Sequence, residues 1–184
     1  MKKLLIISDI HGSSKYLKMA LKREKDYEKI LILGDLYYHG PRNNLPEEYN
    51  PKECASILNS LKEKIIVVRG NCDAEVDQMI SDFPINDFID FKFGKYFIHA
   101  DHGHHYGPDN IPSGNYDLYL YGHYHKVNLS LVDGKIIASP GSISLPKDEY
   151  HAYIELYEDG KIELRNLLDD SLIKEFKRLS NTIY

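Results

Sequence analysis

Three short apolar runs without polar interruption constrain the fold more than any other feature of the sequence. They span residues 3–8, 29–33 and 65–68, and a segment with helical spacing of apolar residues separates each run from the next. Strands that show no alternation of polar and apolar residues are typical of a sheet covered on both faces. The first part of the chain therefore predicts a β-α-β-α-β unit with a parallel sheet.

The two helices of this unit have recognisable starts. Ser13 or Ser14 is expected to cap a helix that reaches Lys25, and Pro51 is expected in the first turn of a second helix that runs to Leu61. Between the second strand and that helix, residues 36–50 are rich in proline, glycine and asparagine. This composition predicts a loop, and loops of this length often carry function.

From residue 85 onwards the pattern changes to strands alone. The strand-like runs lie at residues 85–93, 95–100, 116–121, 127–132, 135–138, 152–157 and 161–167. Asp133-Gly134 and Asp159-Gly160 each separate two such runs, and both predict type I′ hairpin turns. The whole chain, 1–184, is thus expected to form one domain of two sheets packed face to face, with helices outside.

Composition narrows the classes of function. The chain has 28 acidic and 23 basic residues and a net charge of -5. This charge argues against a broad nucleic-acid surface and leaves room for a small phosphorylated ligand. The apolar run near Met1 is shorter than a signal-peptide core, and no apolar stretch approaches the roughly 20 residues that span a bilayer. We expect a soluble cytoplasmic protein without a membrane partner, in which Cys54 and Cys72 are free thiols.

Carboxylate, imidazole and amide side chains follow the three buried strands. Asp9 and His11 come just after the first strand, and an extended backbone would point both side chains the same way. Asp35 follows the second strand and Asn71 the third. Ligands gather at the carboxyl ends of strands in α/β sheets, so these four side chains are candidates for one metal site. A chance Asp-x-His pair and an ordinary turn asparagine are the simpler alternatives.

Two histidines end the run at residues 116–121. His123 and His125 are separated by one residue and follow Gly122, which allows a tight backbone turn. Neutral imidazoles at this spacing are candidate metal ligands, and two exposed histidines without a shared role are the alternative.

Four of the nine histidines lie within residues 99–105. His102 is the preferred metal ligand, because it comes just beyond the end of the run at 95–100. His104 is then a group that touches a metal ligand or the substrate. His99, still on the strand, is expected to be buried or hydrogen-bonded, and His105 to face solvent.

Taken in order, these motifs resemble a known family. Asp9-x-His11, Gly34-Asp35, Gly70-Asn71-x-Asp73, His102 and Gly122-His123-x-His125 are similar to the motif series of the calcineurin-like metallophosphoesterases. Residues 35–43, 69–79 and 104–112 resemble, in addition, the small bacterial phosphodiesterases of that superfamily. The resemblance covers nearly the whole chain and implies an αββα sandwich.

The resemblance also implies a metal-ligand set. One ion would be held by Asp9, His11, Asp35 and His125. The second would be held by Asp35, Asn71, His102 and His123, so that Asp35 bridges the two. Manganese is the metal expected from the resemblance, while zinc, iron and magnesium are also compatible with this mixture of nitrogen and oxygen ligands.

A two-metal site of this kind hydrolyses phosphate esters with an activated water. Asp35, Asn71, Cys72 and His104 are the candidate catalytic residues. Asn71 and His104 are also candidates for substrate binding, together with His39 and Arg42 from the loop after Asp35. For His39 and Arg42, a role as ordinary exposed loop residues is an equal alternative.

Cys72 departs from the wider family, in which histidine often follows the Gly-Asn pair. A thiol is a weak proton donor and cannot replace an imidazolium, so proton donation to a poor leaving group is in question. Simple packing is the alternative for Cys72. The sequence favours a phosphodiesterase for small phosphodiesters. A non-catalytic scaffold, a nuclease and a phosphomonoesterase are the other possibilities on this fold, and 15 tyrosines make a homo-oligomer plausible.

Overall fold

The predicted parallel unit opens the chain, of which the computed structural model describes residues 1–177. Strands β1 (Lys3–Ile7), β2 (Lys29–Ile32) and β3 (Ile65–Val68) pair side by side in parallel. Helices α1 (Ser14–Ala20) and α2 (Pro51–Ser60) connect them. The expected caps are present, since Ser13 Oγ accepts a hydrogen bond from the amide of Tyr16 and Pro51 begins α2.

Four further strands extend this sheet to seven. On the β1 side lie β10 (Ala152–Tyr157), β11 (Lys161–Asn166) and β12 (Leu172–Lys177), which pair antiparallel with their neighbours. On the other side β4 (Ile85–Asn86) pairs in parallel with β3. The order across the sheet is β12-β11-β10-β1-β2-β3-β4.

The second sheet has five strands. Its order is β5 (Phe88–Phe93), β6 (Tyr96–Asp101), β7 (Leu118–Leu120), β9 (Lys135–Pro140) and β8 (Val127–Val132). The central β6, β7 and β9 are parallel, and the outer two strands are antiparallel to them.

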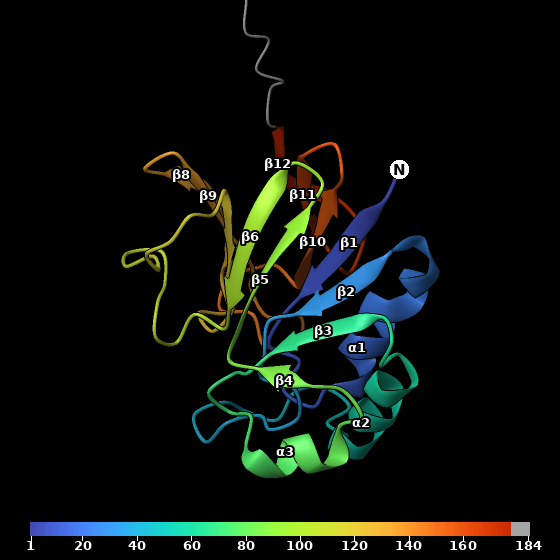
Figure 1. Cartoon of the computed structure of the whole chain (residues 1–184). Coiled ribbons are helices and arrows are strands. Elements are labelled where there is room, and N and C mark those ends of the chain that lie inside the picture. Colours follow the sequence, from blue (N-terminus) through green and yellow to red (C-terminus); the bar gives the residue numbers. More distant parts are fainter. Residues whose placement is uncertain (178–184) are drawn as a thin grey trace, which may run out of the picture.

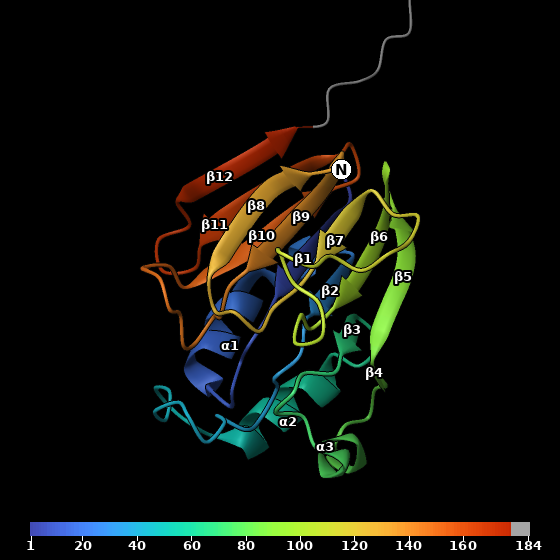
Figure 2. The same ribbon diagram turned by 90° about the vertical axis from the view of Figure 1, so that its left-hand side faces the viewer.

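The two sheets pack face to face, as Figures 1 and 2 show. Ile6 from β1 and Ile98 and Leu118 from the five-stranded sheet belong to one buried apolar cluster. A second cluster lies on the opposite face of the seven-stranded sheet, where Leu17 of α1 and Leu58 of α2 cover it. The seven-stranded sheet is thus buried on both faces, which explains the uninterrupted apolar runs of β1, β2 and β3.

The predicted fold class is confirmed, with one difference in the outermost layer. The helices of residues 1–177 lie on the seven-stranded sheet, and a long loop, residues 102–117, crosses the outer face of the five-stranded sheet instead (Figure 2). Beneath the loop, Tyr119, Tyr121 and Ile137 are buried with little access to solvent. Aromatic side chains therefore cover a face that a helix would otherwise protect.

Several local expectations need correction. The first helix ends at Ala20 and continues as a 3-10 segment, η1 (Leu21–Asp26), within which Arg23 leaves helical geometry. The run at residues 85–93 is not one strand, since the chain crosses at Asp87 from β4 in one sheet to β5 in the other. Helix α3 (Glu75–Ile80) and strand β12 were not expected.

The two hairpin turns also differ from each other. Asp133 and Gly134 both have positive φ, as the predicted type I′ turn requires. At the second hairpin Gly160 has a φ of 90°, but Asp159 is not among the positive-φ residues, so a type I′ turn is wrong there. No helix within residues 1–177 is long and apolar enough to cross a membrane.

Candidate metal centre

Five strand ends bring the predicted metal ligands together. Asp9, Asp35 and Asn71 follow the parallel strands β1, β2 and β3, and His102 and His123 follow β6 and β7 of the facing sheet. The carboxyl ends of both parallel groups point to the same edge of the sandwich. Because the two sheets meet there, ligands from segments far apart in sequence come within contact of one another.

The backbone of this site is unusual. Five of the eight non-glycine residues with positive φ in residues 1–177 are predicted metal ligands: Asp9 (54°), His11 (49°), Asp35 (55°), His123 (66°) and His125 (57°). Non-glycine residues rarely adopt this left-handed conformation, which costs energy and concentrates at functional sites. The expected extended backbone at Asp9 and His11 is therefore wrong. The left-handed turns aim these side chains into the site.

Two glycines allow the loops to approach closely. A Cβ atom on Gly70 would lie 2.0 Å from Asp35 Oδ1, and one on Gly122 would lie 2.1 Å from Ser8 Oγ. Both distances are far shorter than any van der Waals contact. Side chains at these positions would push the loops of the site apart, which explains the Gly-Asn and Gly-His pairs in the sequence.

Three of the histidines are held in one tautomer. Each donates a hydrogen bond from Nδ1 to a backbone carbonyl: His11 to Tyr38 O at 2.8 Å, His102 to Leu33 O at 2.6 Å and His125 to Leu145 O at 2.6 Å. A carbonyl oxygen is only an acceptor, so the hydrogen must be on Nδ1. When the ring is neutral, the lone pair of each Nε2 then faces the site, as in metal-binding histidines.

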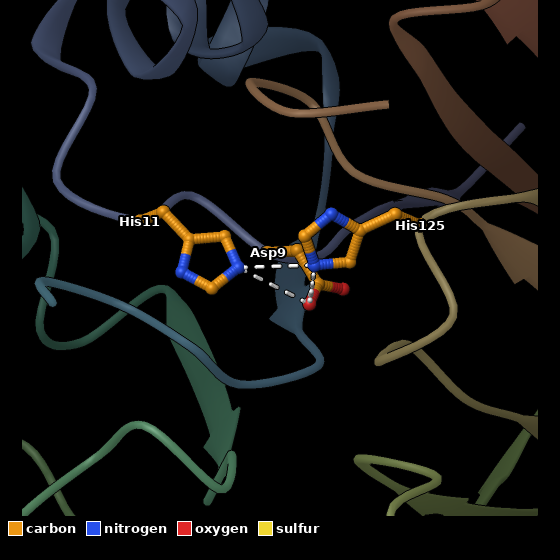
Figure 3. Close-up of side chains that lie close together, drawn as sticks. All are labelled: Asp9, His11 and His125. Carbon is orange, nitrogen blue, oxygen red and sulfur yellow. Dashed lines mark hydrogen bonds and ion pairs between the residues drawn. The ribbon is translucent and has the colours of Figure 1, made fainter. Parts of the chain in front are cut away.

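Asp9, His11 and His125 form the first cluster (Figure 3). The Nε2 atoms of the two histidines are 3.1 Å apart, and Asp9 Oδ1 lies 3.2 Å from His125 Nε2 and 3.6 Å from His11 Nε2. Buried Asp9 Oδ1 accepts no hydrogen bond from any described residue. Two lone pairs and a carboxylate oxygen that converge in this way fit a cation at their centre.

The other oxygen of Asp9 is already satisfied. Asp9 Oδ2 accepts hydrogen bonds from Ser8 Oγ at 2.5 Å and from the amide of His123 at 3.1 Å. The hydroxyls of Ser142 and Ser144 both donate to the carbonyl oxygen of Asp9. These contacts fix the carboxylate so that Oδ1 alone faces the cluster.

Asn71, His102 and His123 form the second cluster. Asn71 Oδ1 lies 2.7 Å from His123 Nδ1 and 3.2 Å from His102 Nε2. Asp35 stands between the two clusters, because its Oδ2 is 3.4 Å from His102 Nε2 and 3.6 Å from His11 Nε2. Its Oδ1 accepts the amide hydrogen of Cys72 at 2.8 Å. One oxygen of Asp35 is therefore anchored, and the other faces both clusters at once.

Comparison with known proteins identifies the family. Residues 1–159 match the calcineurin-like phosphoesterase superfamily domain. The chain belongs to this superfamily. It is 39% identical over 180 residues to the phosphodiesterase YfcE of Escherichia coli K12, which covers 95% of this chain and 97% of that protein. The family and the enzyme class predicted from the motifs, a phosphoesterase, are confirmed.

Solved structures of the superfamily agree with this fold. The E. coli phosphoesterase YfcE superposes with a TM-score of 0.89 at 37% identity and covers 95% of this chain and 98% of that one. The zinc complex of Vps29 from Entamoeba histolytica superposes with a TM-score of 0.64 at 22% identity, covering 95% and 98%. The second likeness concerns the fold alone.

One residue that holds the metallophosphoesterase site together was given no role in the sequence analysis. The carboxylate of Asp73 accepts the amide hydrogens of Asp35 at 2.9 Å, Leu36 at 2.7 Å and Gly70 at 2.7 Å. It thereby ties the loop after β2 to the loop after β3. Burial raises the pKa of Asp73, although these amides oppose that effect. The Gly-Asn-x-Asp spacing was the signal for this role.

The carboxylates and imidazoles of the site shift one another's pKa values. Burial would raise the pKa of Asp9, but the imidazoles of His11 and His125, which face its carboxylate, outweigh burial and lower the pKa. Burial would lower the pKa of His102, yet the hydrogen bond with Asp35 and the charge of Asp9 raise that pKa to about 9. The metal-free site thus holds protons that a cation must displace.

Metal binding is therefore expected to release protons. With a pKa of about 9, His102 is protonated at pH 7 before metal binds and must be neutral to ligate it, so about one proton should leave per chain. Metal affinity should fall as the pH is lowered below 9. Calorimetric titration with Mn²⁺ in two buffers of different ionisation enthalpy measures the proton count, and a binding enthalpy that is the same in both buffers would contradict this expectation.

The clusters open into a cavity of about 620 Å³. Arg42, Cys72 and Asn71 line it, as expected for residues that meet a substrate, and so does Lys147, which the sequence analysis did not single out. The amide of Lys147 donates to the carbonyl of His125, so the loop that contains Lys147 is hydrogen-bonded to the loop that contains this predicted ligand. A lone lysine far from every motif gave no signal in the sequence.

Two other substrate-binding candidates do not line this cavity. The ring of His39 packs edge-on against Tyr38 and Tyr49, at centroid distances of 4.8 Å and 5.3 Å. The structure thus places His39 beside its own loop rather than toward the clusters. His104 is exposed, and its ring lies 6.2 Å from that of His123, at the rim of the site.

Proposed function

We propose that this chain is a metal-dependent phosphodiesterase that hydrolyses small phosphodiesters with two divalent ions, of which Mn²⁺ is the preferred one. The observation that carries the proposal is the position of Asp35, whose Oδ2 faces His11 in one cluster and His102 in the other. A single oxygen directed at two ligand clusters is what a shared, bridging carboxylate requires. The name of the E. coli relative, a phosphodiesterase, supports the same reaction.

The residues present fit the two ions. Asp9, His11, Asp35 and His125 would hold one, and Asp35, Asn71, His102 and His123 the other. Bound there, two divalent ions would supply an activated water and neutralise charge on the phosphoryl oxygens. Imidazole ligands suit zinc and iron, and carboxylate ligands suit manganese and magnesium, so the mixed set does not select the ion by itself.

The side chains of the cavity would receive the substrate. Arg42 and Lys147 are the cations that line it, and both can attract the negative phosphate group. The fixed tautomers of His11, His102 and His125 keep their Nε2 lone pairs toward the clusters without reorganisation when substrate arrives. The cavity is concave enough for a small ester, in keeping with a substrate smaller than nucleic acid.

The experiment that tests this proposal compares substrates and metals. The purified protein is stripped of metal, reloaded with Mn²⁺, Zn²⁺, Fe²⁺ or Mg²⁺, and assayed on bis(p-nitrophenyl) phosphate and on p-nitrophenyl phosphate. We expect the highest rate with Mn²⁺ and the diester, and two ions per chain by elemental analysis. Faster hydrolysis of the monoester would favour a phosphomonoesterase, and bound metal without hydrolysis of either ester would favour a scaffold.

Cys72 leads to a prediction about leaving groups. Burial and the nearby Asp35 raise the pKa of its thiol to about 12, so the side chain is a neutral thiol at pH 7. It lies at the cavity next to Asn71, whose Nδ2 donates to Cys72 Sγ at 3.4 Å. Because a thiol is a weak proton donor, we expect diesters with an acidic nitrophenol leaving group to react well ahead of alkyl monoesters.

Cys72→His should shift this balance toward poorer leaving groups while the metal content stays the same. The measurement is the ratio of the two hydrolysis rates in the wild type and in Cys72→His. A ratio that does not change would mean that residue 72 does not reach the leaving oxygen and only packs in the loop.

A further inference from the structure

A second pocket, of about 400 Å³, lies beside the metal centre on the outer face of the five-stranded sheet. Residues of β5 and β6 and of the loop at residues 102–117 line it. Figure 2 shows this loop on the outer side of the five-stranded sheet. His104 lines this pocket, and its ring is 5.5 Å from that of the predicted ligand His102. His102 itself also lines the pocket, so the pocket reaches a predicted metal ligand.

Aromatic rings form the floor and wall of this pocket. The ring of His99 stacks with those of Phe88 and Tyr116, at centroid distances of 5.7 Å and 5.5 Å and interplanar angles of 28° and 29°. Phe88 is 58% exposed and Phe97 is 43% exposed, although both are large and apolar. Exposed aromatic faces gathered around one hollow are the surface that attracts a cation.

The charges of the pocket are negative. Asp90 Oδ1 lies 2.7 Å from His99 Nδ1, and Asp101 Oδ2 lies 3.6 Å from His99 Nε2. Two carboxylates thus share one imidazole, which leaves at least one negative charge uncompensated even when His99 is protonated. Tyr119 OH donates to Asp101 at 2.8 Å and adds no charge.

This second pocket, here called the aromatic pocket, and the cavity at the metal centre differ in the sign of the charged side chains that line them. None of the residues that line the aromatic pocket, all within residues 1–177, is a lysine or arginine, whereas Arg42 and Lys147 line the metal cavity. Lys135 does not line the pocket, but its Nζ lies 3.9 Å from the ring centroid of Tyr116, so that ring already has a cation on its face. Asp87, also on the pocket, pairs with Arg69 at 3.4 Å, but Arg69 does not line it. The metal cavity therefore suits an anion, and the aromatic pocket suits a cation.

We propose that the aromatic pocket binds a cationic alcohol group of the phosphodiester substrate, one that carries a quaternary or protonated amine. The substrate is then zwitterionic, with its phosphate at the metal centre and its ammonium group against the exposed ring of Phe88, beside Asp90 and Asp101. This proposal rests on the proposed phosphodiesterase function and specifies its substrate class. The reaction remains hydrolysis of one P–O ester bond by water.

The test uses two substrates that differ in one charge. Both are p-nitrophenyl diesters, one of choline and one of 3,3-dimethylbutanol, whose tert-butyl group has the shape of the choline head without its charge. With the metal-loaded enzyme, we expect kcat/KM for the choline ester to exceed that of the neutral ester by about 10-fold. A ratio near one in an active enzyme would overturn the proposal, and so would faster hydrolysis of the p-nitrophenyl ester of thymidine 5′-phosphate than of the choline ester.

Variants of Phe88 test whether the preference for the choline ester arises in this pocket. Phe88→Leu removes the ring and keeps an apolar side chain, and it should lower the choline preference about 3-fold, whereas Phe88→Tyr should keep the preference. Leu131→Ala, 60% exposed on β8, is the control outside the pocket and should leave the ratio unchanged. Equal ratios in Phe88→Leu and the wild type would contradict the assignment of this pocket.

A binding measurement separates this proposal from the proposed function. Calorimetry of the metal-loaded protein with choline alone requires no hydrolysis. If neither ester is hydrolysed, the phosphodiesterase proposal fails, yet choline binding that weakens in Phe88→Leu would still support a cation pocket. Absence of choline binding in the wild type would overturn the pocket whatever the protein hydrolyses.

Discussion

Asp35→Asn is expected to reduce kcat for phosphodiester hydrolysis by roughly 100-fold or more and to lower the amount of bound metal. The reason is that Asp35 Oδ2 faces both ligand clusters, so loss of its charge weakens both at once. The amide keeps the size of the side chain and can still accept the hydrogen bond from the amide of Cys72. Turnover of bis(p-nitrophenyl) phosphate and elemental analysis measure the two effects.

Arg42→Ala is the matched comparison on the same cavity. Arg42 is exposed and faces no ligand cluster closely enough to form an ion pair among the described residues. It should therefore mainly raise KM, by about 5-fold, and leave the metal content as it is. An Asp35→Asn protein with full metal and full turnover would show that the two clusters do not share this carboxylate.

His102→Ala should remove one metal ion per chain and nearly all turnover. His102 is fully buried, its Nδ1 is held by the carbonyl of Leu33, and its Nε2 faces both Asp35 and Asn71. Metal content, turnover and thermal unfolding, the last with a chelator present, separate loss of the ligand from loss of the fold.

His99→Ala is the comparison for His102→Ala, because His99 lies on β6 and His102 directly follows that strand. His99 bonds to Asp90 at 2.7 Å, which confirms the expected hydrogen-bonded histidine, and its hydrogen bonds raise its pKa. Its loss should lower the free energy of unfolding by about 1 kcal/mol and leave the metal count intact. The opposite pattern, with metal lost in His99→Ala and kept in His102→Ala, would assign the ligand to His99.

The order of the ligands along the chain could be predicted because each follows a recognisable buried strand. Strand ends gather at one edge of a parallel sheet, so the positions of Asp9, Asp35 and Asn71 in the sequence are enough to predict that they meet. The motif series also identified the family that the comparisons confirm. The sequence pattern contained the list of candidate ligands and the strands that they follow.

The details that escaped prediction depend on contacts between distant segments. Left-handed φ at Asp9 and His11 follows from loop packing that no local rule indicates. The break at Asp87 depends on which sheet each half of the run joins. Lys147 reaches the cavity only because its loop bonds to the carbonyl of His125. His39 lies in the expected loop, yet its neighbours Tyr38 and Tyr49 hold its ring.

In the proposed site, Asp35 would bind both metal ions. Electron paramagnetic resonance of the wild-type protein loaded with Mn²⁺ tests it most directly, because two manganese ions that share a ligand are magnetically coupled. The account predicts two ions per chain and a spin-coupled spectrum, which should be lost in Asp35→Asn. A spectrum of isolated Mn²⁺ at full loading of the wild type would contradict the shared site.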